Sequence, residues 1–251
     1  MQKYKYVIAA VIIVLLGVVA VLLFSKDSVT NTNESGDVVD FQNARIPKLE
    51  EGVNVHELEN EIFEILGPEN VAITTDRSSG SGILWQYDGE RLVAVTTSHL
   101  TRDFEQGEIE LWSGEKVTFE KANVQASSKL DFAVIVISCE EKLKLDKGGA
   151  SAYAVDKTPE IGAAMWVIDS VYGAASGIGT CSVASSAIFL EDYGTEMLLL
   201  YGQGKTGMSG SPMYDEDGRL VAMVSGMNAD GTTLAAVPVG KIMNFFETLE
   251  E

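Results

Sequence analysis

The sequence contains few residues of the types that build metal centres or disulfide scaffolds. Its 251 residues include two cysteines, Cys139 and Cys181, and two histidines, His56 and His99. These four residues cannot form a Cys/His zinc site at the usual spacing, and no Asp/Asn-rich calcium loop is present. We therefore expect neither a metal ion nor another cofactor. The cysteines leave two alternatives open, one disulfide or two free thiols.

Basic residues are also scarce. Lys and Arg number 18 against 37 Asp and Glu, and the net charge is −19. Such a chain lacks the excess of basic residues that binds a phosphate backbone, so nucleic acid is not an expected partner. The 46% of hydrophobic and 22% of charged residues are ordinary for a globular protein.

Residues 7–24 form an apolar run that carries no charge. A helix of this length spans about 27 Å, close to the hydrocarbon thickness of a bilayer. A cleaved signal peptide and a buried globular helix are the alternatives. The exit Leu22–Ser25 lacks a small-residue cleavage pair, which favours an uncleaved transmembrane signal-anchor. Lys3 and Lys5 precede the run, so residues 1–6 are expected in the cytoplasm and the rest outside a single-pass cell membrane.

The remaining chain divides into a linker and a folded domain. Residues 25–55 are polar and lack periodicity, which predicts a flexible stalk, and residues 56–251 form the predicted domain. An amphipathic helix is expected over 56–66 and a closing helix over 240–249. Between them lie about eleven short apolar runs separated by turn sequences. This spacing indicates an antiparallel all-β sandwich or barrel.

Three separate segments carry residues suited to acyl transfer. They are Thr96–Leu100, Leu130–Ile137 and Thr206–Pro212. A serine hydroxyl needs an adjacent base, and an imidazole needs a carboxylate to hold its tautomer. His99, Asp131 and Ser209 supply these three groups. Taken singly, each segment is more often a strand end, a turn or a tight loop, but together they predict a catalytic triad.

The developing oxyanion of such a reaction needs backbone N–H donors that converge on one point. Glycines beside Ser209 permit the tight turn that this convergence requires. We therefore expect the N–H groups of Gly207 and Ser209 to form the oxyanion hole.

Residues 70–248 resemble the trypsin-like (chymotrypsin-fold) serine proteases, nearest the HtrA/Deg branch and its bacterial relatives. The resemblance is carried by Gly80–Leu84, Thr97–Leu100, Leu130–Val134, Gly207–Met213 and Leu234–Pro238. It implies two antiparallel six-stranded β-barrels, a C-terminal helix and a site in the cleft between the barrels. It also implies a serine endopeptidase that acts on protein or peptide substrates through an acyl-enzyme intermediate.

The sequence departs from the family pattern at several positions. Met208 replaces the acidic residue that digestive relatives use to bind a new N-terminus, so the site must be ordered in another way. Gln203, Ser225 and Met227 resemble substrate-pocket positions, and the neutral Gln203 does not support a preference for Arg or Lys. We expect no C-terminal PDZ domain after residue 251.

Two other hydrolase classes fit the sequence less well. An α/β-hydrolase requires a histidine after the nucleophile, and no histidine follows Ser209. The chain order Asp, His, Ser of the subtilisin class could use Asp76 or Asp88 with His99. That class requires a parallel α/β architecture, which conflicts with the strand spacing. The remaining alternative is a catalytically silent protease-like module that serves as an extracellular binding or sensor domain.

Overall fold

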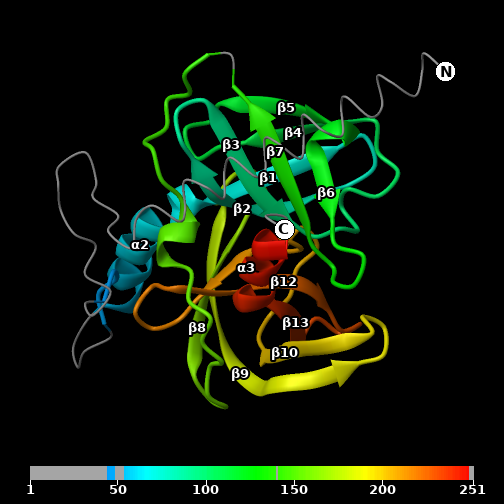
Figure 1. Ribbon diagram of the computed structural model, residues 1–251. Helices are drawn as coiled ribbons and strands as arrows, with labels where there is room; N and C mark the ends of the chain where they lie inside the picture. Colours follow the sequence, from blue (N-terminus) through cyan, green and yellow to red (C-terminus); the bar gives the residue numbers. More distant parts are fainter. Residues whose placement is uncertain (1–43, 49–53, 140, 249–251) are drawn as a thin grey trace.

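The computed structural model describes residues 44–48, 54–139 and 141–248. Two β units follow one another along the chain, the N-terminal one in the upper half and the C-terminal one in the lower half of Figure 1. The N-terminal strands are β1 (Asn70–Thr75), β2 (Ser79–Tyr87), β3 (Arg91–Thr96), β4 (Gln106–Glu110), β5 (Lys116–Glu120), β6 (Val124–Ala126) and β7 (Ala133–Ser138). The C-terminal strands are β8 (Ala164–Asp169), β9 (Gly177–Leu190), β10 (Thr195–Tyr201), β11 (Pro212–Tyr214), β12 (Leu220–Met227) and β13 (Thr233–Pro238).

The C-terminal unit is the closed six-stranded barrel that the resemblance predicts. Its order is β10-β13-β12-β11-β8-β9, and β9 pairs with β10 to close it. Every pairing is antiparallel. Alternate inward side chains of these strands make one apolar core, as period-two strands around a closed barrel require.

The N-terminal unit corrects the prediction of a second six-stranded barrel. It is a seven-stranded antiparallel sheet of order β5-β4-β1-β2-β3-β7-β6, with β5 and β6 at its edges. The 3-10 turn η2 (Lys121–Asn123) joins these edges along the chain. The Asn123 side chain accepts from Glu120 N at 2.8 Å and donates to Val136 O at 3.0 Å. The Asn123 side chain therefore links the end of β5 to β7, and the edge strands β5 and β6 do not pair to close the sheet.

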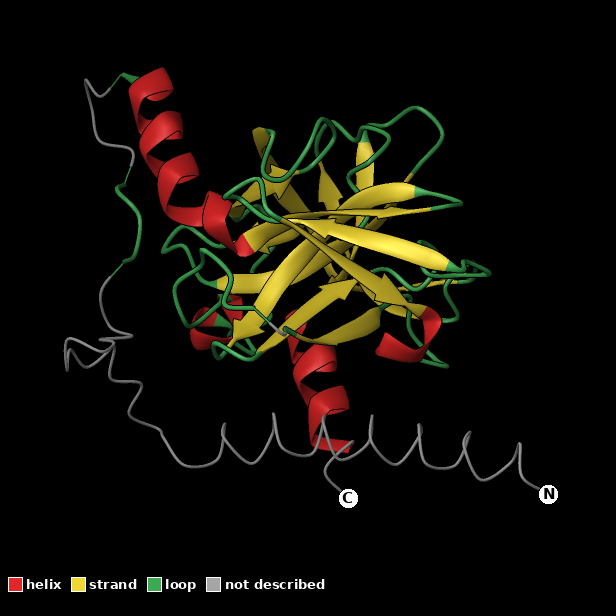
Figure 2. Cartoon of the chain, turned by 90° about the horizontal axis from the view of Figure 1, so that it is seen from above, coloured by secondary structure: helices red, strands yellow, loops and turns green. Residues whose placement is uncertain are grey.

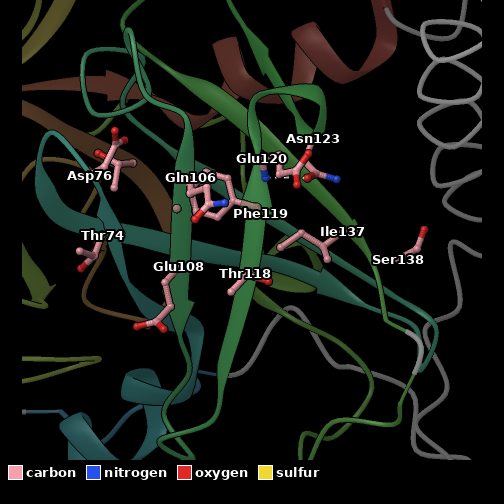
Figure 3. A pocket seen from close by; sticks show the side chains of 12 residues that line it. Thr74, Asp76, Gln106, Glu108, Thr118, Phe119, Glu120, Asn123, Ile137 and Ser138 are labelled. Atoms are coloured by element: carbon pink, nitrogen blue, oxygen red, sulfur yellow. Dashed lines mark hydrogen bonds between the residues drawn. The ribbon is translucent and has the colours of Figure 1, made fainter. Parts of the chain in front are cut away.

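This open seam has a hollow beside it. The hollow measures about 720 Å³ and is lined from β1, β4, β5, η2 and β7 (Figure 3). Phe119 and Ile137 form its apolar floor, and Asp76, Glu108 and Glu120 stand around it. His99, Asp131 and Ser209 do not line it.

Two helices pack on the strands from different sides (Figure 2). Helix α2 (Val55–Leu66) begins at Asn54, whose side chain accepts from the N–H of His56, and ends before the 3-10 turn η1 (Gly67–Glu69). Leu58, Ile62 and Leu66 are its buried positions. The predicted helix is thus present, one residue longer at its start.

The closing helix α3 (Val239–Thr248) connects the two β units. It follows β13 of the barrel, yet its aromatic side chains reach the N-terminal sheet. The ring of Phe246 stacks on Trp85 at 5.1 Å, and Phe245 meets Phe132 edge-on at 5.0 Å. Both units and both helices therefore share one apolar core between them.

Asn70, at the start of β1, ties the two units together with polar bonds. It is fully buried, and its Nδ2 donates to Gly82 O at 3.3 Å and Ile168 O at 3.2 Å. Its Oδ1 accepts from Ala175 N at 2.6 Å and from Ser170 Oγ. Each of these partners lies in a strand or loop where one unit meets the other. Because hydrogen bonds are directional, they fix the register in which the two apolar surfaces pack.

The short segment of residues 44–48, which the sequence assigns to the linker, lies against the C-terminal barrel. Ile46 is 4% exposed and joins the shared core. Arg45 N donates to Asp217 O at 2.8 Å, and its guanidinium donates to Gly218 O at 2.8 Å. The same guanidinium pairs with the buried Glu69.

Within residues 44–48, 54–139 and 141–248, none of the helices has the length and apolar character needed to cross a membrane. The predicted anchor, residues 7–24, lies outside the described residues.

We predict that Arg45→Met strongly destabilises the folded domain. Burial raises the pKa of Glu69, and Arg45 is the cation that opposes this effect. Removing one partner of a buried ion pair costs about 3–5 kcal/mol. Urea unfolding of the variant should show a loss of this size.

Lys48→Ala is the matched control, because Lys48 pairs with Asp217 at 3.1 Å while 57% of its side chain is exposed. Exposed pairs contribute little, so its unfolding midpoint should stay near that of the parent. Equal losses in the two variants would contradict the assignment of Arg45 as the buried partner.

Candidate active site

The His99 imidazole and the Asp131 carboxylate meet where two neighbouring strands end. His99 follows β3 and Asp131 precedes β7, and these strands pair antiparallel with Thr96 opposite Ala133. His99 Nδ1 lies 2.8 Å from Asp131 Oδ2. The backbone N–H of His99 also donates to Asp131 Oδ1 at 3.1 Å. One carboxylate therefore orients both the ring and the main chain of the histidine.

Two further hydroxyls satisfy Asp131. Ser98 Oγ donates to Oδ1 at 2.8 Å, and Ser225 Oγ donates to Oδ2 from strand β12 of the other unit. Burial disfavours the charged carboxylate, but the hydrogen bonds from His99, Ser225 and Ser98 outweigh it and lower the pKa of Asp131 to about 2. Asp131 is therefore an anion at neutral pH. It accepts a hydrogen bond from Nδ1–H, so Nε2 is the ring nitrogen of His99 that can exchange a proton with a substrate or a nucleophile.

Ser209 lies on the loop between β10 and β11, at the edge of the barrel. Its Oγ donates to the carbonyl of Ser225 at 3.4 Å. Ser225 thus binds the serine hydroxyl through its carbonyl and Asp131 through its own hydroxyl. No hydrogen bond joins Ser209 to His99 among the described residues, and His99 Nε2 instead contacts Thr97 Oγ1 at 3.4 Å. Catalytic hydrogen bonds are often long or unformed in an enzyme without substrate.

The main chain around Ser209 leaves two amides unused. The amides of Met208 and Ser211 donate to Lys205 O and Met208 O, at 3.2 and 2.9 Å. The amides of Gly207 and Ser209 form no hydrogen bond with the described residues. Gly207 has φ +99°, a conformation that L side chains rarely adopt. The loop therefore presents two free N–H donors beside the hydroxyl.

Met208 shows how this loop is held without an acidic residue at its position. The side chain is 3% exposed and belongs to the core of the C-terminal barrel. Its Sδ accepts from the N–H of Lys205 at 3.2 Å. The apolar burial of Met208 thus anchors the turn that carries Ser209.

Comparison with known families agrees with this architecture. The model of the trypsin-like peptidase domain matches residues 80–223, more than half of the chain and inclusive of all three candidate residues. The chain belongs to the trypsin-like peptidase family. It is a serine endopeptidase, a hydrolase. No curated protein sequence matches it.

Solved structures with the same fold include proteases of the HtrA type. The HtrA-type protease AlgW in complex with a tripeptide superposes with a TM-score of 0.60 at 16% identity, over 76% of this chain and 62% of that one. A serine endoprotease from Yersinia pestis gives 0.58 at 18% identity, over 76% and 66%. An inactive form of Rv3671c from M. tuberculosis H37Rv gives 0.56 at 15% identity, over 81% and 96%. This peptidase spans less than two thirds of the AlgW chain.

The three residues expected to form the substrate pocket have different surroundings. Gln203 is exposed on the surface of the peptidase. Ser225 is buried, and its hydroxyl binds Asp131. Met227 is 45% exposed and lies against Gly204, where its Sδ is 2.7 Å from the point that a Cβ would occupy. Met227 therefore fills space beside Gly204. The roles of Gln203, Ser225 and Met227 in binding a substrate stay predictions.

A hollow of about 380 Å³ does adjoin the His99–Asp131 pair. Leu130, Arg102 and Lys129 line it from the N-terminal unit, and Tyr193 lines it from the hairpin between β9 and β10. The Tyr193 hydroxyl reaches to 2.3 Å from the position of a Cβ on Gly226. Sequence reasoning did not find Tyr193, because nothing in a hairpin tip indicates which distant strand it will cover.

The cysteines are unpaired. Cys181 is buried in β9 of the barrel, and Cys139 follows β7 of the other unit. Burial raises the pKa of Cys139 and brings that of Cys181 to about 12, so neither is a reactive thiolate at neutral pH. Of the two alternatives, the structure has two free thiols.

We predict that ionised Asp131 stabilises the domain in a pH-dependent way. Its folded pKa is about 2, against an ordinary value of 3.8 for the free side chain. The stabilisation is therefore fully present above about pH 4 and is lost as the pH falls towards 2. Its size is about 2 kcal/mol.

The check compares urea unfolding of the parent protein and of Asp131→Asn at about pH 6 and about pH 2. The stability advantage of the parent should shrink by about 2 kcal/mol at the lower pH. A difference in unfolding free energy that does not change with pH would show that the partners of Asp131 do not stabilise its ionised carboxylate.

Proposed function

We propose that this peptidase cleaves peptide bonds through a triad of Ser209, His99 and Asp131. The observation that carries the proposal is the position of Ser225, which binds the Ser209 hydroxyl and the Asp131 carboxylate while Asp131 binds His99. Hydrogen bonds thereby connect residues from both β units.

In the proposed reaction the Ser209 hydroxyl first turns from Ser225 O towards His99. Its oxygen attacks the carbonyl carbon of the scissile bond while Nε2 of His99 takes the proton. The amides of Gly207 and Ser209 donate to the oxyanion of the tetrahedral intermediate. The imidazolium then protonates the leaving amine, and the C–N bond breaks to give an acyl-serine.

Hydrolysis of the acyl-serine reverses these roles. His99 takes a proton from water, the hydroxide attacks the acyl carbon, and the proton returns to Ser209 as the peptide acid leaves. Asp131 stays ionised throughout, because its pKa of about 2 lies far below the working pH. Its charge stabilises the imidazolium in both halves of the reaction.

We predict that a fluorophosphonate probe modifies Ser209 of the full chain. Labelling should vanish in Ser209→Ala and fall by at least about 10³-fold in His99→Ala, because the hydroxyl loses its general base. Mass spectrometry of the labelled peptide identifies the site. His56→Ala is the matched control, since His56 is exposed on helix α2 and far along the chain from the triad.

A folded chain that never reacts with the probe would overturn the catalytic proposal. It would favour a silent protease-like module that binds peptides. The unformed bond between Ser209 and His99 is the one feature of the described residues that favours this second function.

We also propose that residues 7–24 anchor the peptidase in the cell membrane, with residues 1–6 in the cytoplasm and the domain outside. The uncharged length of the run and the lysines before it support this topology. The strongly acidic remainder is repelled by anionic lipid, which suits a domain held away from the bilayer.

We predict that the full chain stays with membranes after an alkaline wash and that a chain lacking residues 1–24 does not. External protease added to intact cells should remove the domain from the full chain. A domain that is protected in intact cells, or one released by the wash, would contradict the proposed topology.

A further inference from the structure

Ser81 lies in strand β2, at the boundary between the two β units, and its side chain is fully buried. Its main chain already contacts the loop that carries the nucleophile. Ser81 N donates to Ser209 O at 2.8 Å, and Thr96 Oγ1 donates to Ser81 O at 2.7 Å. The approach is so close that a Cβ on Gly210 would lie 1.9 Å from Ser81 O.

The hydroxyl of Ser81 connects three segments of the chain. It donates to the carbonyl of Gly207 at 2.9 Å and accepts from the N–H of Ser170 at 2.9 Å. Ser170 belongs to the loop after β8, and the next residue, Val171, packs on Gly207 with its Cα 3.3 Å from the position of a Cβ there. Gly207 is therefore held on two sides by groups outside its own loop.

The Gly207 carbonyl belongs to the peptide unit that separates the two free amides. A peptide unit is planar, so the direction of its carbonyl sets the direction of the whole unit. Gly207 has no side chain to restrict rotation, so hydrogen bonds set the orientation of this unit. Its N–H, that of Met208, donates to Lys205 O at 3.2 Å within the loop, and its carbonyl accepts from Ser81 of the other β unit. The amides of Gly207 and Ser209 can face the same point only while this unit keeps one orientation.

We propose that Ser81 is a positioning residue that holds the oxyanion hole in its active orientation from the opposite β unit. This inference rests on the proposed function, because it assumes that the Gly207 and Ser209 amides bind the oxyanion. Preorganised donors stabilise a transition state because they do not have to reorient during the reaction. Ser81 contributes by keeping the two donors fixed before the substrate arrives.

Loss of the Ser81 hydroxyl leaves the Gly207 carbonyl and the Ser170 amide without their partner. The unpaired carbonyl gains by turning towards water, and this rotation moves the peptide unit between the two donors. The expected consequence is slower chemistry with little change in the binding of a substrate's ground state. Removal of one oxyanion donor costs about 10²–10³ in rate, so a displaced donor pair should cost about 10–100-fold.

The experiment uses the full chain and two reagents that act on different parts of the site. A fluorophosphonate forms a bond to Ser209, and its phosphoryl oxygen takes the place of the oxyanion beside the Gly207 and Ser209 amides. Diethyl pyrocarbonate acylates the His99 ring directly from solution and forms no bond to Ser209. Rates are compared for the parent and for Ser81→Ala, Ser81→Cys and Ser186→Ala. The cysteine has the same shape with a somewhat larger atom in place of the hydroxyl oxygen, and it is a much weaker hydrogen-bond donor.

Ser186→Ala is the matched control. Its Oγ donates to the carbonyl of Pro159 at 2.6 Å, from a half-buried position on β9 of the C-terminal barrel. Ser186 and Ser81 therefore each lose one hydroxyl-to-carbonyl bond, but only Ser81 contacts the nucleophile loop. Near-ultraviolet circular dichroism and the unfolding midpoint report whether each variant is folded.

The proposal expects a fall of about 10–100-fold in fluorophosphonate labelling for both Ser81 variants, with His99 acylation and Ser186→Ala within about twofold of the parent. Should Ser81→Ala fail to fold, Ser81→Cys alone carries the comparison. Parent-like labelling in a folded Ser81→Cys would show that the volume of Ser81, and not its hydrogen bond, matters, and would overturn the proposal. Equal slowing of labelling and of His99 acylation would also overturn the proposal, because it would show that the substitution disorders the whole site.

An unreactive parent overturns the proposed function and this inference with it. A reactive parent together with unaffected Ser81 variants overturns this inference alone, and the triad proposal stands. The two failures are therefore distinguishable in one set of measurements.

Discussion

The apolar core between the two β units is the constraint on which the site depends. Neither unit carries the whole candidate site, because His99 and Asp131 adjoin strands of the N-terminal sheet while Ser209 and Ser225 belong to the C-terminal barrel. Hydrophobic burial brings the units together but is not directional. The geometry of the site therefore requires polar contacts across the same boundary, and the buried bonds of Asn70, Ser81 and Ser225 supply them in a fixed register. The position of each functional group follows from this combination of burial and register.

The charges of the site are balanced locally, although the chain as a whole is strongly acidic. Asp131 is surrounded by donors from Ser98, Ser225 and His99, so its charge is stabilised despite burial. The nucleophile loop that carries Ser209, by contrast, is held by the apolar packing of Met208 in the barrel core and not by hydrogen bonds to a charged group.

Local patterns were sufficient to predict several elements. The amphipathic run of α2 and the closing helix α3 appear within a residue or two of their predicted bounds, because their apolar spacing matches the helical period. The number of strands in the first unit and its open seam were not predictable. Closure depends on whether the edge strands β5 and β6 pair. The Asn123 side chain bonds Glu120 at the end of β5 and Val136 in β7, and it gives no local sign of this role. The hydrogen bond from Ser225 to Asp131 likewise depends on how two distant strands approach each other.

The sequence by itself determined the identity and order of the reactive groups, since imidazole, carboxylate and hydroxyl have intrinsic chemistry that does not depend on the fold. It also determined the glycines of the nucleophile loop, because only glycine adopts the backbone conformation found at Gly207 without strain. The tertiary structure decided which hydroxyls satisfy Asp131, what fills the space beside Gly204, and that Ser81 reaches Gly207 from the other unit. These contacts join residues far apart in the chain. Their distances follow from the packing of whole units, and no local pattern encodes them.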